Sequence, residues 1–379
     1  MTGPIDTDEF CCASLDLSQT KWVCAFSAPL SRRPSVQSFA GGSTEQLVGW
    51  LEKQRQRSEA FLGRPLKIVL CYESGYDGFW LARLLPTRGI RTIVFDPASF
   101  LRPRRGRIAK TDRLDAEDMI RTLRAWLSGD ASVAREVRVP SIEEEDAKRL
   151  ARERKHLVNE RTRLIGRIKG VCALHGVRVR PHMISKRWAR TLDQQLTGEG
   201  KPIPPFLRRE LQRMLRRYEF LIALIREVES DTAKAVSDPE SPFPQKPKVA
   251  LLAKLAGVGQ GSAAMLVAEV FVRTFENQRK LSSFLGLAPT PHASGEISRN
   301  KGISKAGCKL ARSTLVELAW SWLRYQHDSA LATWWRARFS KRGMRVRNIG
   351  IVALARKLVV AFWQFVEDGQ VPEDALLKA

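Results

Sequence analysis

Two uninterrupted apolar runs constrain the fold of this chain more than any other feature. They are KIVLCYE at residues 67–73 and RTIVFD at residues 91–96. A strand that reads as a continuous apolar run is buried on both faces, so helices must cover both sides of its sheet. Apolar residues at helical spacing in 44–56, and a second helical stretch at 79–85, supply such helices. The sequence therefore predicts an N-terminal α/β domain.

The order of the elements narrows this prediction. Two short β-rich runs, at residues 11–17 and 22–28, flank the turn-like SQTK, and residues 35–42 continue the meander. The first helix, the two buried strands with a helix between them, and a last helix after residue 111 complete the series. Three strands, helix, strand, helix, strand, helix is the order of the ribonuclease-H-like fold. We expect residues 1–128 to form such a domain, of the RuvC-like kind.

The charge of the chain indicates its class of partner. There are 64 Lys and Arg against 40 Asp and Glu, a formal net charge of +24, which favours a polyanion. A membrane is disfavoured, because the acidic first ten residues lack a signal-peptide core and the longest apolar stretch contains Arg356 and Lys357. Six cysteines without CxxC or Cys/His spacing indicate neither zinc nor disulfides. We expect a cytoplasmic, nucleoid-associated protein.

The region 129–240 is predicted to be a basic helical or coiled-coil domain. From residue 146 to 229 it holds 21 Lys and Arg against nine Asp and Glu, a net charge of +12. Leucines recur every seven residues from Leu150 to Leu164, and residues 207–228 repeat at three- and four-residue steps. This pattern is typical of an antiparallel helix pair or of a coil between chains. We expect phosphate contacts rather than merely a solvated face, at Arg161, Arg163, Arg167 and Lys169.

The proline-rich segment SDPESPFPQKPK at 237–248 indicates a linker to a third, mostly helical domain, residues 241–379. It is followed by VALLAKLAGVGQGSAAMLVAEV, which predicts a helix-hairpin-helix. Its glycines miss the spacing of a dinucleotide fingerprint and follow a helix rather than a strand. They serve either to offer backbone N–H groups to a phosphate or to allow two helices to cross closely. The sequence leaves these two readings open.

Four carboxylates stand where strands and a helix of the first domain end or begin. Asp112 and Asp115 lie three residues apart in GRIAKTDRLDAEDM, so they share one helix face. Asp16 interrupts the first strand, and Glu73 ends the central one. Each has an ordinary structural reading as a capping or turn residue. Together they form the oxygen-rich layout that a two-metal phosphodiester site needs, with two Mg²⁺ as the expected cofactors.

Several motifs together resemble the DEDD-type insertion-sequence transposases, a family of bridge-RNA-guided DNA recombinases. The motifs are LDLSQTKW, CYESGYDGFWLARLL, FDPASFLR with KTDRLDAED, and SFLGLAPTPHASGEISRNKGISKAGCKLARSTLVELAW. The resemblance implies a RuvC-like N-terminal domain, a helical middle and a C-terminal transposase domain. It places the four metal-binding acids on Asp16, Glu73, Asp112 and Asp115, while Asp77, Asp96 and Asp118 match nothing catalytic. It also implies donor and target DNA, a structured bridge RNA, and a homodimer or homotetramer.

The same resemblance implies that Ser294, in HASGE upstream of GISKAG, attacks DNA and becomes covalently attached to it. A serine hydroxyl needs a base or a metal to become a nucleophile, so the implied site is composite, with Ser294 reaching the four acids. Arg299, Lys301 and Lys305 make the surrounding segment basic, as phosphate binding requires. Glu296 and Cys308 depart from the residues usual in the family. Two alternatives stay open: a RuvC-type structure-selective endonuclease that uses water, and a non-catalytic basic nucleic-acid-binding protein.

Overall fold

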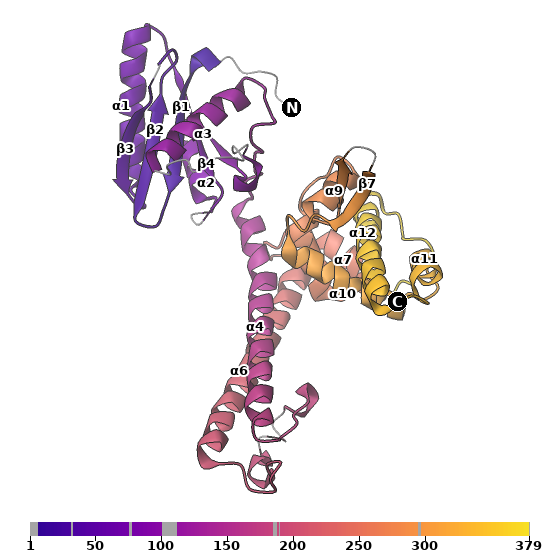
Figure 1. Ribbon diagram of the computed structural model, residues 1–379. Helices are drawn as coiled ribbons and strands as arrows, with labels where there is room; N and C mark the ends of the chain where they lie inside the picture. Colours follow the sequence, from indigo (N-terminus) through magenta and orange to yellow (C-terminus); the bar gives the residue numbers. More distant parts are fainter. Residues whose placement is uncertain are drawn as a thin grey trace. The chain divides into compact units, whose positions relative to one another are not determined.

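The computed structural model describes all residues except 1–6, 32, 76–77, 101–111, 185–187, 189, 295–296 and 379. The chain divides into two compact units, Met1–Pro140 and Ser141–Ala379. The first is the indigo to purple part of Figure 1, and the second runs from magenta to yellow. The first unit is a mixed α/β sheet domain and the second is mostly helical. This confirms the prediction of an N-terminal α/β domain followed by helical regions.

The first unit is built on a five-stranded sheet with the strand order β3-β2-β1-β4-β5. Strands β1, β2 and β3 form an antiparallel meander, whereas β4 and β5 run parallel to β1. The strands are β1 (Phe10–Leu17), β2 (Lys21–Ser27), β3 (Ser35–Ala40), β4 (Lys67–Glu73) and β5 (Ile90–Phe95). The helices are α1 (Thr44–Leu62), α2 (Trp80–Leu84) and α3 (Asp112–Leu127). The predicted order of strands and helices is therefore confirmed.

Helices α1 and α3 cover opposite faces of this sheet (Figure 1). Successive side chains of β1 alternate between the two cores: Cys11, Ala13 and Leu15 pack on the α1 side, and Cys12 packs on the α3 side. Both sides of β4 are also buried, as its continuous apolar sequence predicts. The sheet is thus the middle layer of three.

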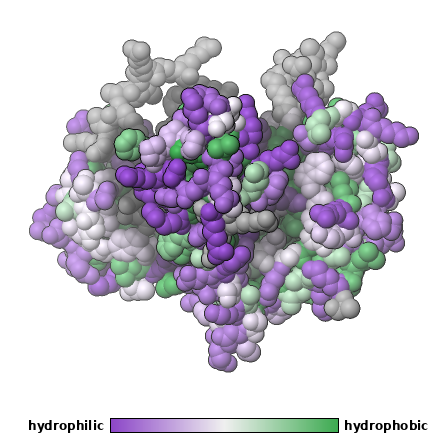
Figure 2. Space-filling view, turned by 90° about the horizontal axis from the view of Figure 1, so that it is seen from below, coloured by the Kyte–Doolittle hydropathy of each residue, from purple (hydrophilic) through white to green (hydrophobic). Residues whose placement is uncertain are grey.

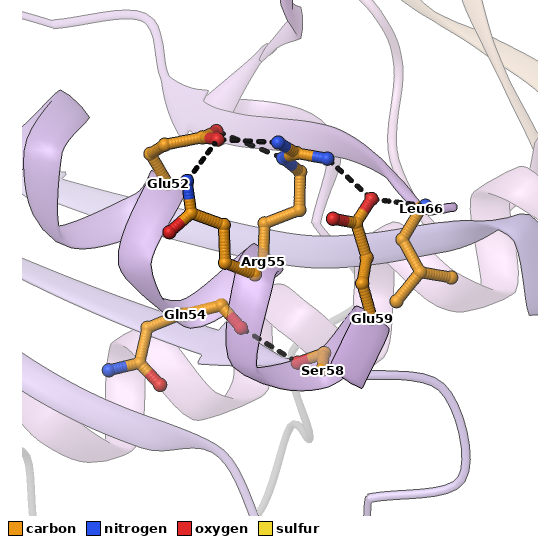
Figure 3. A network of polar contacts seen from close by, with 7 residues as sticks. Glu52, Gln54, Arg55, Ser58, Glu59 and Leu66 are labelled. Carbon is orange, nitrogen blue, oxygen red and sulfur yellow. Dashed lines mark hydrogen bonds and ion pairs between the residues drawn. The ribbon is translucent and has the colours of Figure 1, made fainter. Parts of the chain in front are cut away.

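A polar network holds the end of α1 against the start of β4 (Figure 3). The Arg55 guanidinium pairs with Glu52 and Glu59 of its own helix. The Glu59 carboxylate in turn accepts a hydrogen bond of 2.8 Å from the backbone N–H of Leu66, one residue before β4. The network therefore fixes the entry of the chain into β4, whose far end carries Glu73.

Two long helices, α4 (Ile142–Ala173) and α6 (Pro205–Ser237), open the second unit and lie side by side in Figure 1. Ion pairs at 2.7 Å between Arg154 and Glu229, and at 2.8 Å between Arg167 and Glu210, show that the helices are antiparallel. The two helices therefore pair within one chain, which is the first of the two predicted arrangements. A capping box between Ser141 and Glu144 begins α4.

The rest of the second unit packs around one large apolar core. Its elements are α7 (Lys246–Lys254), α8 (Gln260–Leu266), a π-helical turn (Val267–Phe271), α9 (Gln278–Phe284), β6 (Pro289–Ser294), β7 (Ile297–Ile303), α10 (Lys309–Tyr325), α11 (Ala330–Phe339) and α12 (Met344–Asp368). Strands β6 and β7 form an antiparallel hairpin, which the sequence did not predict. The predicted helix-hairpin-helix segment corresponds to α7 and α8.

Helix α12 is the one helix in the described part of the chain that is long and apolar enough to cross a membrane. Half of its most apolar window is buried inside the second unit. Residues such as Leu354, Leu358 and Phe362 are fully buried in the apolar core. The core therefore accounts for the composition of α12. On the face of the molecule in Figure 2, hydrophilic residues predominate and apolar residues form separate small groups.

Candidate active site

Asp16 and Glu73 come together at one edge of the sheet. Strands β1 and β4 are parallel and in register from Phe10↔Lys67 to Leu15↔Tyr72, so both acids follow at the carboxyl ends of neighbouring strands. By strand alternation both side chains belong to the α3 face. Both are half-buried. They line a cavity of about 130 Å³, to which α3 contributes Met119.

Two hydrogen bonds hold α3 over this edge. The Ser14 hydroxyl donates to the carbonyl of Ala116 at 2.6 Å, and the Cys71 thiol lies 3.8 Å from the carbonyl of Met119. Asp115 directly precedes Ala116 and is half-buried. Asp112 is the first residue of α3, one turn before Ala116, and its side chain lies outside the described residues. The first turns of α3 therefore lie against the strand ends that carry Asp16 and Glu73.

The donor set at this edge fits a hard cation in part. Asp16 and Glu73 supply the carboxylate oxygens that Mg²⁺ prefers. Within the described residues, however, no three acids, histidines or cysteines are grouped closely enough to hold a metal ion. The group of four acids includes Asp112, whose side chain is outside those residues. The complete metal site therefore stays a prediction.

Ser294 is the last residue of β6 and pairs with Ile297 across the hairpin. The structure therefore places the serine at the last pair of a two-stranded ladder. The side chains of Ser294, Arg299 and Lys301 lie outside the described residues. The serine belongs to the second unit and the acids to the first. A composite site between them stays a prediction.

The GISKAG element closes the base of this hairpin. The backbone N–H of Ser304 donates to the carbonyl of Ala288 at 3.0 Å, and that of Lys305 donates to Gly286 at 3.1 Å. Gly307 has a φ of +84°, and a Cβ there would overlap with the carbonyl of Phe284. Glycine is needed at this position because the loop presses against the end of α9 in a left-handed conformation. Lys305 is exposed, as a phosphate-binding role requires.

The predicted nucleic-acid-binding residues of α4 differ in their surroundings. Arg163 and Lys169 are exposed, whereas Arg161 is half-buried. The guanidinium of Arg167 pairs with Glu210 of α6. A cavity of about 350 Å³ beside them is lined by Glu160, Arg163, Leu164, Arg167 and Arg217. Part of the basic surface therefore also holds the helix pair together.

The predicted glycine turn between α7 and α8 serves a close helix contact at Gly257. This residue has a φ of +85°, and a Cβ there would lie 3.2 Å from the side chains of Ser321 and Tyr325 in α10. The Ser321 hydroxyl donates to the Gly257 carbonyl at 2.7 Å. Gly259 and Gly261 instead border a cavity of about 420 Å³ between α4, α6, α8 and α10. The close-crossing reading is therefore supported at Gly257.

A buried charge cluster was missed by the sequence analysis. Glu269 lies in the π-helical turn with 5% of its surface exposed, and Arg152 of α4 binds both of its carboxylate oxygens, at 2.7 and 3.1 Å. Burial lowers the pKa of the nearby Lys148 amine, and the charge of Glu269 opposes that shift. The Cys308 thiol lies 3.9 Å from Glu269, and burial raises its pKa. An acid inside the apolar run MLVAEV was the available signal.

The sequence of the chain is similar to those of known transposases. A family model described as "Transposase IS116/IS110/IS902 family" matches residues 249–334, from α7 to α11. A putative transposase, y4rJ, of Sinorhizobium fredii is 39% identical over 96% of this chain and 94% of its own length. The transposase for insertion sequence element IS1111A of Coxiella burnetii is 30% identical over 67% of this chain and 66% of its own length.

A third relative, the transposase for insertion sequence element IS1328 of Yersinia enterocolitica, is 26% identical over 82% of this chain and 87% of its own length. These similarities extend over both structural units, well beyond the segment matched by the family model. Because the Sinorhizobium relative matches nearly end to end, the chain belongs to the IS116/IS110/IS902 family of insertion-sequence transposases.

Proposed function

We propose that this transposase cuts and rejoins DNA through a ribonuclease-H-like site of four acids together with the nucleophile Ser294. The observation that supports this most is the meeting of Asp16 and Glu73 at one sheet edge under α3, the helix that carries Asp112 and Asp115. Two Mg²⁺ bound by these four acids would stabilise the charge that develops on the phosphate oxygens. We infer that a bridge RNA guides the enzyme and that it acts as a homo-oligomer in the cytoplasm, at the nucleoid.

The reaction is a pair of transesterifications. The Ser294 hydroxyl gives its proton to solvent water and its Oγ attacks the scissile phosphorus, so an Oγ–P bond forms while the bond from phosphorus to one bridging DNA oxygen breaks. The released DNA oxygen takes up a proton and leaves as a hydroxyl. A hydroxyl from a second DNA end then attacks the same phosphorus and regenerates the free serine. Phosphodiester bonds are exchanged and none is hydrolysed, so the reaction needs no nucleotide triphosphate.

A covalent adduct tests this function. Wild-type protein quenched during reaction with donor DNA is expected to carry DNA that survives denaturation, and Ser294→Ala is expected to carry none and to recombine nothing. Ser304→Ala is the matched control, because it removes an exposed hydroxyl from the base of the same hairpin. An alanine at the exposed Ser304 costs within about 0.5 kcal/mol of stability, and the circular dichroism of both variants checks that they fold.

The alternatives give different outcomes in the same experiment. Full cleavage by Ser294→Ala without any adduct would establish the water-using nuclease and leave the acid site standing. No cleavage by the wild type, with intact DNA binding, would favour the non-catalytic binder.

We further propose that α4 binds nucleic acid through phosphates. Replacing the exposed Arg163 and Lys169 by glutamate should weaken binding to unrelated sequences alike, because phosphates carry no sequence information. Each lost phosphate contact lowers the slope of log K against log salt by about 0.9. Affinity measured over a salt series is therefore expected to show a slope smaller by about two. An unchanged slope would mean that this face of α4 is only solvated.

A further inference from the structure

The corner between α11 and α12 carries a dense group of cations and no acid. The sequence contains no Asp or Glu between Asp328 and Glu367. Within that stretch six cations fall in twelve residues: Arg336, Arg338, Lys341, Arg342, Arg345 and Arg347. All are exposed except Arg347, which is half-buried. We call the surface formed by residues 336–349 the corner patch.

The packing of α11 against α12 leaves the residues of this corner outside the core. The ring of Phe339, at the end of α11, lies where a Cβ of Gly350 would be, so α11 presses directly on the α12 backbone at that residue. The buried part of α12 begins only at Gly350. The preceding residues project from the core, and Met344 and Ile349 are 65% and 58% exposed.

The cations of the corner patch are not neutralised by acids. Among the described residues none of the six forms an ion pair with a carboxylate. Arg338 lies over the ring of Trp334 at 5.3 Å, and the Arg336 guanidinium donates to the hydroxyl of Thr333 at 3.2 Å. An aromatic face and a neutral acceptor orient these side chains without removing their positive charge. The patch therefore presents a field that favours an anion.

We propose that the corner patch binds the phosphate backbone of duplex DNA. Its cations match phosphates, and the first turn of α12 adds the positive end of a 25-residue helix. The exposed Met344 and Val346 alternate with the cations along the chain and the exposed Ile349 follows them, as apolar side chains accompany cations in proteins that contact the sugars and bases of a groove. The proposal rests on membership in a DNA transposase family and is independent of the serine mechanism.

Charge and burial disfavour two other occupants. A second copy in a two-fold contact would place six cations against six like charges. An anionic membrane would need an apolar helix face, whereas the apolar residues of α12 beyond Ile349 pack into the core. Duplex DNA avoids both difficulties, because its phosphates are negatively charged and because it needs no further apolar residues of α12 to leave the core.

The test is a triple charge reversal in the full-length protein, Lys341→Glu, Arg342→Glu and Arg345→Glu. These side chains are exposed, and a glutamate at 345 suits the first turn of α12, so the fold should be unaffected. The control is Lys53→Glu, Arg57→Glu and Arg64→Glu, which makes the same change in net charge at exposed positions on or just after α1 of the other unit. Binding to a short random duplex is measured over a salt series with a chelator present, so cleavage plays no part.

The corner variant is expected to bind duplex DNA at least about tenfold more weakly, with a salt slope smaller by two to three, while the control changes less. An equal loss in both variants would mean that net charge alone matters and would overturn the proposal. A loss confined to a structured RNA, or to vesicles of anionic lipid, would assign the patch to that ligand instead. A change in the sedimentation mass, with DNA binding intact, would make it a contact between copies. None of these outcomes bears on the Ser294 adduct.

Discussion

Replacing Glu73 by glutamine, or Asp115 by asparagine, is expected to lower strand cleavage by about 10³-fold or more while DNA affinity stays nearly unchanged. Each substitution keeps the shape of the side chain and removes a negative charge, from the sheet edge in the case of Glu73 and from α3 in the case of Asp115. If the four acids hold Mg²⁺ as proposed, losing one carboxylate ligand would weaken the metal's stabilisation of the phosphoryl charge by several kcal/mol in the transition state, and each 1.4 kcal/mol is tenfold in rate. Binding persists because the basic surfaces supply it.

Single-turnover cleavage of labelled donor DNA measures the rate, and a filter or gel-shift assay measures the affinity. Asp118→Asn is the matched control: Asp118 lies on the same helix, but its carboxylate is exposed and pairs with Arg121 at 2.6 Å. We expect it to retain activity. Equal loss in the control would mean that the charge of α3, rather than a particular site, is what matters. Retained cleavage in Glu73→Gln would remove that residue from the site.

The fold of the first unit could be predicted from the sequence because short-range patterns, such as apolar runs bounded by polar residues, define its strands and helices. Strand β4 agrees with its prediction at both ends, since an apolar run bounded by polar residues has only one place to begin and end. Strands β1 and β2 agree to within one residue at each end. The placement of Asp16 and Glu73 at the same sheet edge followed from topology, because parallel neighbours place their carboxyl ends together. The sequence could not supply the hydrogen bond from Ser14 that positions α3.

The β6–β7 hairpin escaped prediction because its sequence carries the wrong local signals. Strand β6 is PTPHAS, and its two prolines cannot donate to a ladder, so the segment is typical of a loop. The pairing exists as an isolated two-stranded ribbon whose base is held by backbone bonds to the α9 end. Those bonds join residues distant in sequence. The α4–α6 pair was ambiguous for a related reason, because a heptad pattern is the same whether the partner helix belongs to one chain or two.

The interior of the second unit yields the largest expected effect on stability. Replacing Arg152 by methionine should lower the free energy of unfolding by about 3 kcal/mol, because it leaves the Glu269 carboxylate buried without its two hydrogen bonds. Since the second unit spans residues 141–379, such a loss corresponds to a fall in melting temperature of about 6–12 °C. Thermal unfolding followed by calorimetry measures it.

Arg154→Met provides the control for this change. Arg154 lies half a turn away on α4 and also bridges to a glutamate, Glu229, but both partners are about half exposed. An exposed pair contributes less than about 1 kcal/mol, so this variant should melt close to the wild type. Equal shifts in the melting temperatures of the two variants would show that the Arg152–Glu269 pair contributes no more to stability than the exposed Arg154–Glu229 pair.

A double variant separates the buried charge from the packing. Changing Glu269 to leucine in the Arg152→Met background removes the stranded carboxylate, and replacing buried charged groups by apolar side chains is often neutral. We therefore expect the double variant to recover part of the lost stability. Recovery will be incomplete, because Lys148 is buried beside Glu269 and loses the charge that opposes the lowering of its pKa. A double variant less stable than Arg152→Met would mean that Glu269 supports the π-helical turn by itself, without Arg152.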